Sequence, residues 1–260
     1  KIKESVWQNI STKWLTEYQN ANKAKLNPSL TPRQLESMAL LFNATITPND
    51  SESSLVIKAN KVANQIYGPY LKNKDLDLTV EKPSAEIIKE MAKDGFIYTA
   101  SRYEAYAACM GFLKIRDLKI KNNNLAKIPG LGGVILSGEP GVGKSAFIRA
   151  ILKAHKYTEY KNTALEPDPK TTFIYLASDA SYEQKNELLT KAYYKGYIVI
   201  IDEINTPLYE NLLNGLIGTK TNKEKAPGFM VFGTQNPAYM PGREITSLAT
   251  QHRFLPLDLP

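Results

Sequence analysis

The chain of 260 residues is 43% hydrophobic, carries a net charge of +7 and has a mean hydropathy of -0.33, values typical of a globular protein. Its basic excess is spread evenly over residues 1–115 and 116–260. Because no basic tail or block marks a nucleic-acid-binding surface, nucleic acid is the less favoured partner. No apolar run approaches the roughly 20 residues that span a bilayer, and a single cysteine, Cys109, excludes an intramolecular disulfide; we therefore expect a cytoplasmic protein with no membrane span.

Residues 1–117 are predicted to form an all-helical N-terminal region that is a separate, partner-binding domain. Apolar residues recur at three- and four-residue spacing from Trp7 to Tyr18, which marks the buried face of a helix. Thr31, Pro32 and Gln34 supply an N-cap, a proline in the first turn and a capping-box glutamine. Further helices are predicted over 54–67, from 83 to Gly95 and over 101–114, whereas the polar run 119–124 is predicted to be an exposed loop.

Residues 118–260 are predicted to form a second domain in which strands and helices alternate. Such alternation is typical of an α/β fold with a parallel sheet flanked by helices. The predicted strands are 133–136, 172–177, 197–201, 229–234 and 254–257, and the predicted helices are 145–153, 182–194 and 208–217.

The segment from Gly138 to Ser145, GEPGVGKS, matches the phosphate-binding pattern G-x-x-x-x-G-K-[ST] between a predicted strand and a predicted helix. Its N–H groups can point at phosphate oxygens, Lys144 can reach the β- and γ-phosphates, and the Ser145 hydroxyl can bind Mg²⁺. A glycine-rich turn that only joins strand to helix is the weaker alternative, because motif and context agree. The predicted nucleotide-binding residues are Gly138, Glu139, Pro140, Gly141, Val142, Gly143, Lys144, Ser145 and Ala146.

Two adjacent carboxylates, Asp202 and Glu203, follow the apolar strand 197–201. At a strand end beside a phosphate-binding loop, an aspartate holds Mg²⁺, and its neighbour is placed to orient and deprotonate the attacking water. A solvated acidic pair that caps the next helix would be the better interpretation in isolation. Downstream of GEPGVGKS, the catalytic interpretation is favoured.

Two further polar residues complete the predicted site. Asn236 follows the strand 229–234, where its amide can hydrogen-bond the γ-phosphate or the attacking water; an ordinary Asn-Pro turn is the alternative. Arg253 precedes the apolar segment 254–257, and an arginine supplied in trans can stabilise charge on the transferring phosphoryl group. A surface arginine is the alternative there.

Together these segments resemble the AAA+ ATPase module of the MoxR, midasin and dynein-related group. Residues 189–205, LTKAYYKGYIVIIDEIN, and 233–254, GTQNPAYMPGREITSLATQHRF, are similar to the group's patterns, although His252 stands where the group often has asparagine. The resemblance covers about half of the chain. It implies that Asn236 is the sensor-1 residue and Arg253 the arginine finger, and it places Arg243 in the group's Gly-Arg position.

The resemblance implies a module that hydrolyses ATP with Mg²⁺, works as a ring, expected to be a hexamer, and remodels a protein or protein complex. Members continue into a small helical lid, whereas this sequence runs from Lys1 to Pro260; we expect a lid-less fragment of a longer protein. The alternatives are a non-catalytic nucleotide switch or scaffold and a GTP-specific relative. The polar segment 219–227 is expected to be a solvated loop, with contact to substrate in a central pore as the alternative.

Overall fold

The computed structural model describes residues 2–23, 30–71, 78–161, 166–214, 216, 225–239 and 247–260. Within these residues, six parallel strands form one sheet in the order β2-β3-β4-β5-β1-β6. The strands are β1 (Gly133–Ser137), β2 (Thr158–Glu159), β3 (Thr172–Leu176), β4 (Ile198–Ile201), β5 (Met230–Gln235) and β6 (Leu255–Asp258). The predicted α/β class and parallel sheet are confirmed, and only the two-residue β2 was not expected.

Helices cover both faces of the sheet, which explains why its strands are continuous apolar runs. On one face, Val134, Leu136 and Phe232 pack with α5 (Tyr103–Lys121) and α7 (Lys144–Ala154). On the other face, Ile135 and Val199 pack with α8 (Tyr182–Lys195) and α9 (Pro207–Leu213). A short helix, α10 (Leu248–Gln251), leads into β6.

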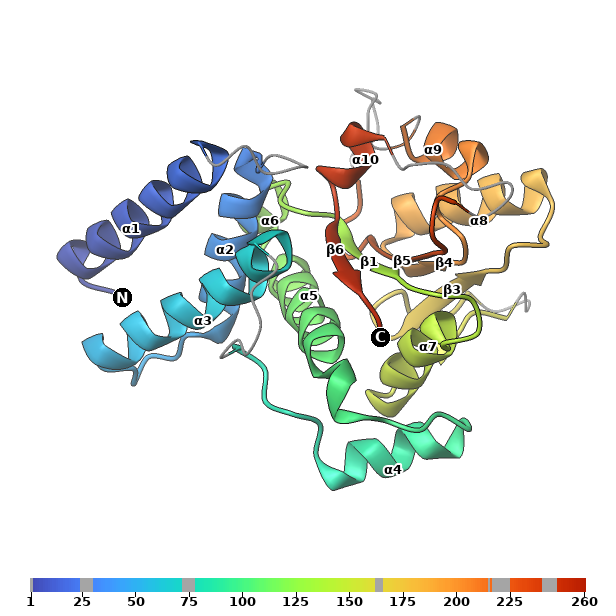
Figure 1. Cartoon of the computed structure of the whole chain (residues 1–260), viewed down its shortest axis with the longest axis horizontal. Helices are drawn as coiled ribbons and strands as arrows, with labels where there is room; N and C mark the ends of the chain where they lie inside the picture. The colour runs from blue at the N-terminus through green and yellow to red at the C-terminus, as the bar shows by residue number, and fades with distance from the viewer. Residues whose placement is uncertain are drawn as a thin grey trace.

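The residues described before β1 form helices and no strand, as the sequence predicts. Figure 1 shows α1, α2 and α3 gathered on one side of the molecule, with α5 between them and the sheet. Trp7 and Trp14 pack around Phe42, with Trp14 edge-on to it at 5.6 Å between ring centroids, so both tryptophans serve the core. The helices are α1 (Glu4–Lys23), α2 (Pro32–Thr45), α3 (Glu52–Leu71), α4 (Ala85–Lys93), the 3-10 helix η1 (Ala100–Arg102), α5 and α6 (Asn123–Ala126).

The prediction that residues 119–124 form an exposed loop is wrong for their conformation, which is mostly helical, although residues 121–124 are exposed as predicted. Lys119 lies within α5 and is only 7% exposed, because its Nζ donates to the carbonyls of Ile128 and Pro129 at 2.7 and 2.8 Å. Asn122 ends α5 and caps α6 by accepting from the N–H of Asn124 and of Leu125. The proposed boundary at 117/118 falls inside α5, and one apolar cluster extends across it from α1 to β6.

Arg116 of α5 fastens the helical region to the sheet. Its side chain is 1% exposed and donates four hydrogen bonds to backbone carbonyls. Nε binds the carbonyl of Gly228 at 2.7 Å, Nη1 that of Lys170 at 2.9 Å, and Nη2 those of Pro169 and Gly196 at 2.7 and 3.0 Å. These carbonyls precede β3, β4 and β5, so one side chain ties the amino ends of three strands to α5.

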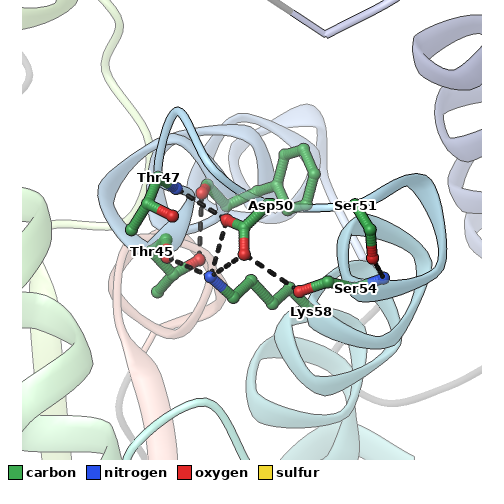
Figure 2. Close-up of polar contacts among 7 residues, drawn as sticks. Thr45, Thr47, Asp50, Ser51, Ser54 and Lys58 are labelled. Carbon is green, nitrogen blue, oxygen red and sulfur yellow. Dashed lines mark hydrogen bonds and ion pairs between the residues drawn. The ribbon is translucent and has the colours of Figure 1, made fainter.

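The carboxylate of Asp50 accepts most of the side-chain hydrogen bonds drawn in the connection from α2 to α3 (Figure 2). Asp50 accepts hydrogen bonds from the Thr47 N–H, the Ser54 hydroxyl and the Lys58 ammonium, which also donates to the Thr45 carbonyl. Bonding to Lys58 and to the Thr47 N–H holds the pKa of Asp50 at about 2.

Among the described helices, none combines the length and apolarity that crossing a membrane requires.

Candidate functional site

The phosphate-binding pattern lies where the sequence predicts it, between the end of β1 and the start of α7. Gly141 and Gly143 adopt φ angles of +82° and +81°, in the left-handed region that favours glycine. Gly143 is the N-cap of α7, so the loop ends at a helix N-terminus, which favours anions. The loop comprises Gly138, Glu139, Pro140, Gly141, Val142 and Gly143, and the first turn of α7 holds Lys144, Ser145 and Ala146.

Lys144 lies folded against this loop and is 7% exposed. Its Nζ donates to the carbonyls of Gly138 at 2.7 Å and Glu139 at 2.9 Å, and to Oδ1 of Asn236 at 3.0 Å. Burial lowers the pKa of Lys144, while the carboxylates of Asp202, Glu139 and Glu203 act in the opposite direction. The ammonium therefore lies among the loop carbonyls and the predicted catalytic side chains.

Asp202 follows β4, and three hydroxyl groups hold its carboxylate. Ser145 Oγ and Thr234 Oγ1 donate to Oδ1 at 2.6 and 2.7 Å, and the Tyr175 hydroxyl donates to Oδ2 at 3.3 Å. Burial and the nearby Asp202 raise the pKa of Tyr175 to about 12, so its hydroxyl stays a donor. Sequence reasoning joined Ser145 to Asp202 but missed Thr234 and Tyr175, because each reads as an ordinary strand residue.

Asn236 connects Lys144 to Glu203. Its Oδ1 accepts from Lys144, and its Nδ2 donates to Oε1 of Glu203 at 3.0 Å. The backbone of Asn236 is itself held, because Asn205 Nδ2 donates to its carbonyl at 3.0 Å. Asn236 therefore acts as a bridge in the site rather than only as a turn former.

Glu203 has a φ of +56°, which is unusual for a residue with a side chain. Thr234 stabilises this conformation, since its hydroxyl accepts from the Glu203 N–H at 3.3 Å and its carbonyl from the Ile204 N–H at 2.8 Å. Strained backbone of this kind clusters at functional sites. The turn places the Glu203 carboxylate beside Asn236 rather than along the strand.

Arg253 is not brought to this site. It precedes β6 and accepts at its carbonyl from the Gly132 N–H, at the amino end of β1, whereas the loop follows the carboxyl end. The six residue steps of extended chain from 132 to 138 separate the two ends by roughly 20 Å. Nη1 of Arg253 donates to Oδ1 of Asn214 at 2.5 Å, and burial lowers the pKa of Arg253.

The donor set fits a magnesium ion that is shared with phosphate. Ser145 and Asp202 offer a hydroxyl and a carboxylate oxygen next to the loop. The described residues contain no group of three or more His, Cys, Asp or Glu side chains that could hold a metal by themselves. Mg²⁺ ordinarily binds through one or two protein oxygens plus substrate phosphates and water.

Arg243, and residues 219–224 of the predicted loop 219–227, lie outside the described residues.

Comparison with known proteins gives the same family. The sequence profile of the AAA domain (dynein-related subfamily) matches residues 133–254. Midasin of Giardia intestinalis is 24% identical over an alignment that covers 92% of this chain, and midasin of Dictyostelium discoideum is 30% identical over an alignment that covers 48% of it. The chain spans 6% and 2% of the length of these relatives. The family profile and these similarities support an AAA+ module of the midasin and dynein-related group within residues 133–254.

Proposed function

We propose that this module binds ATP with Mg²⁺ and hydrolyses it, and that hydrolysis drives the remodelling of a protein or protein complex. The observation that carries the proposal is the bridge through Asn236, which contacts the phosphate-loop lysine on one side and Glu203 on the other. One hydrogen-bonded group thus joins the first turn of α7 to the ends of β4 and β5, and in this proposal it supplies a cation, a metal-binding pair and a general base.

Each side chain then has a distinct role. Lys144 exchanges its bonds to the loop carbonyls for the β- and γ-phosphates, and Ser145 and Asp202 hold the metal. Held there, Mg²⁺ would neutralise negative charge on the phosphate oxygens. Glu203 orients the attacking water and accepts its proton at the carboxylate. Asn236 fixes the orientation of Glu203 and offers its amide to the γ-phosphate.

We further propose that the protein works as a ring, a hexamer, in which Arg253 enters the site of a neighbouring subunit. Arg253 lies at the amino ends of β1 and β6, whereas the phosphate-binding loop follows the carboxyl end of β1, and this separation supports action in trans. The N-terminal helical region is proposed to bind the protein partner. We also propose a cytoplasmic location, which the single, buried and free cysteine, Cys109, supports.

The first test is nucleotide binding and turnover by the purified chain, measured with Mg-ATP and Mg-GTP over a range of protein concentrations. Glu203→Gln should bind Mg-ATP as the wild type does but lose hydrolysis by at least about 100-fold. Glu183→Gln, an exposed change on α8, is the matched control and should hydrolyse normally. Unchanged turnover in Glu203→Gln would remove the general-base assignment.

The ring is tested separately with Arg253→Ala. The rate per subunit should rise with protein concentration in the wild type and stay low in the variant, on the order of 10³-fold below it, while binding by dilute protein is unaffected. Equal loss of binding at low concentration would mean that Arg253 acts within its own subunit. Tight Mg-ATP binding with no turnover at any concentration would instead favour the non-catalytic switch.

A further inference from the structure

A residue of the N-terminal region contacts the phosphate-binding loop directly. Arg102 is the last residue of η1, and its Nη2 donates to the carbonyl of Val142 at 2.9 Å, 40 positions along the chain. Val142 lies in the middle of GEPGVGKS. A side chain outside the predicted nucleotide-binding module therefore contributes to the conformation of its loop.

The second guanidinium nitrogen of Arg102 has no acceptor. Nη1 is buried without a hydrogen-bond partner, and it lies 3.9 Å from the position that a Cβ on Gly143 would occupy. None of the ion pairs found in the described part of the chain includes Arg102. A buried charged donor that lacks an acceptor is unfavourable, so such a group in a native fold calls for a partner.

The surroundings of Arg102 hold it in place. Its guanidinium lies over the rings of Phe96 at 4.8 Å and Phe147 at 5.8 Å. Those rings pack against each other at 5.2 Å between centroids, and Phe147 belongs to α7, one turn beyond the loop. Cation–π contacts fix the plane of the guanidinium. In this arrangement Nη1 lies beside Gly143.

We propose that Arg102 belongs to the nucleotide site: it holds the loop through Val142 and donates Nη1 to a phosphate oxygen of the bound nucleoside triphosphate beside Gly143. The proposal rests on the proposed nucleotide binding. Arg102 is half-buried, and an anionic oxygen is the natural acceptor for its buried Nη1 at a phosphate-binding loop. It follows that η1 and the adjoining α5 sense nucleotide occupancy through a direct contact.

The test compares Arg102→Met and Arg102→Lys with the wild-type chain. The probes are a fluorescent Mg-ATP analogue and inorganic tripolyphosphate as competitor, each titrated at several salt concentrations. Arg102→Met, whose apolar side chain still packs on the two rings, should weaken both ligands about 10- to 100-fold and reduce the salt dependence of the affinity. Arg102→Lys keeps the charge but loses the fork of donors, so it should recover part of the affinity.

Arg33→Met is the matched control, because Arg33 also belongs to the N-terminal region and donates to one backbone carbonyl, that of Gly130 at 3.1 Å. It should bind both probes as the wild type does. Wild-type affinity in Arg102→Met, alongside lost binding in Lys144→Ala, would overturn the inference and leave the proposed function standing. Weaker binding with an unchanged salt dependence would also overturn the phosphate contact. A wild-type chain that binds neither probe would refute the proposed function first.

Discussion

Replacing Arg116 by methionine should be among the most destabilising single changes in the described part of the chain. Methionine matches the apolar stem of arginine in length and keeps that stem packed, so the change removes chiefly the guanidinium. Four backbone carbonyls lose their donor at once. The four carbonyls belong to three segments, each of which precedes a different strand.

The magnitude follows from the number of bonds. A hydrogen bond to a charged group contributes about 1.5 to 3 kcal/mol net, so four would sum to at least about 6 kcal/mol. Two effects reduce this value. Burial disfavours the Arg116 cation, as its lowered pKa indicates. Pro169 and Lys170 lie near solvent, so water can reach their carbonyls. We therefore expect a loss of about 4 kcal/mol in the free energy of unfolding.

Urea unfolding followed by circular dichroism measures this loss, which corresponds to a shift of the midpoint by about 1 to 2 M. Arg116→Lys should lose roughly half as much, because an ammonium has three donors for four carbonyls. Arg33→Met, which removes a bond to one carbonyl, should lose at most about 1 kcal/mol. A loss below about 1 kcal/mol in Arg116→Met would show that water satisfies the carbonyls equally well and would refute the reasoning.

Two further predictions concern single hydrogen-bonded carboxylates. Tyr175→Phe removes the donor to Oδ2 of Asp202 and should raise the Mg²⁺ concentration for half-maximal hydrolysis about 3- to 10-fold. Tyr197→Phe is the control, because the Tyr197 hydroxyl donates to a backbone carbonyl away from the site, and it should leave that concentration unchanged. Equal Mg²⁺ titrations for the two variants would contradict the role of Tyr175. Because the pKa of Asp50 falls from 3.8 to about 2 on folding, its bond to Lys58 stabilises the fold above about pH 4, and this stability is lost as the pH falls through about 2. Asp50→Asn should therefore be less stable than the wild type at pH 6, with the gap closing towards pH 2 in urea unfolding; a gap independent of pH would count against the ion pair.

The sequence by itself determined the elements whose signals are local. GEPGVGKS, the apolar run before Asp202, and the alternation of strands with helices depend on residues close together in the chain, so they predicted the loop, the carboxylate at the strand end and the parallel sheet. The capping box of α2 was predicted for the same reason: Thr31 and Gln34 are three residues apart, and the Thr31 N–H donates to Gln34 Oε1 at 2.9 Å.

The tertiary structure alone decided the contacts between distant segments. Nothing near Arg116 or Arg102 in the sequence marks them, because their hydrogen-bond partners lie 40 to 112 positions away. Lys119 reads as part of a polar loop, yet it is buried, since the carbonyls that bind its ammonium are presented only once α5 packs on the segment before β1. Which residues share an edge of the sheet is likewise set by strand order and direction: this arrangement joins Asn236 to Lys144 and places Arg253 at the opposite end.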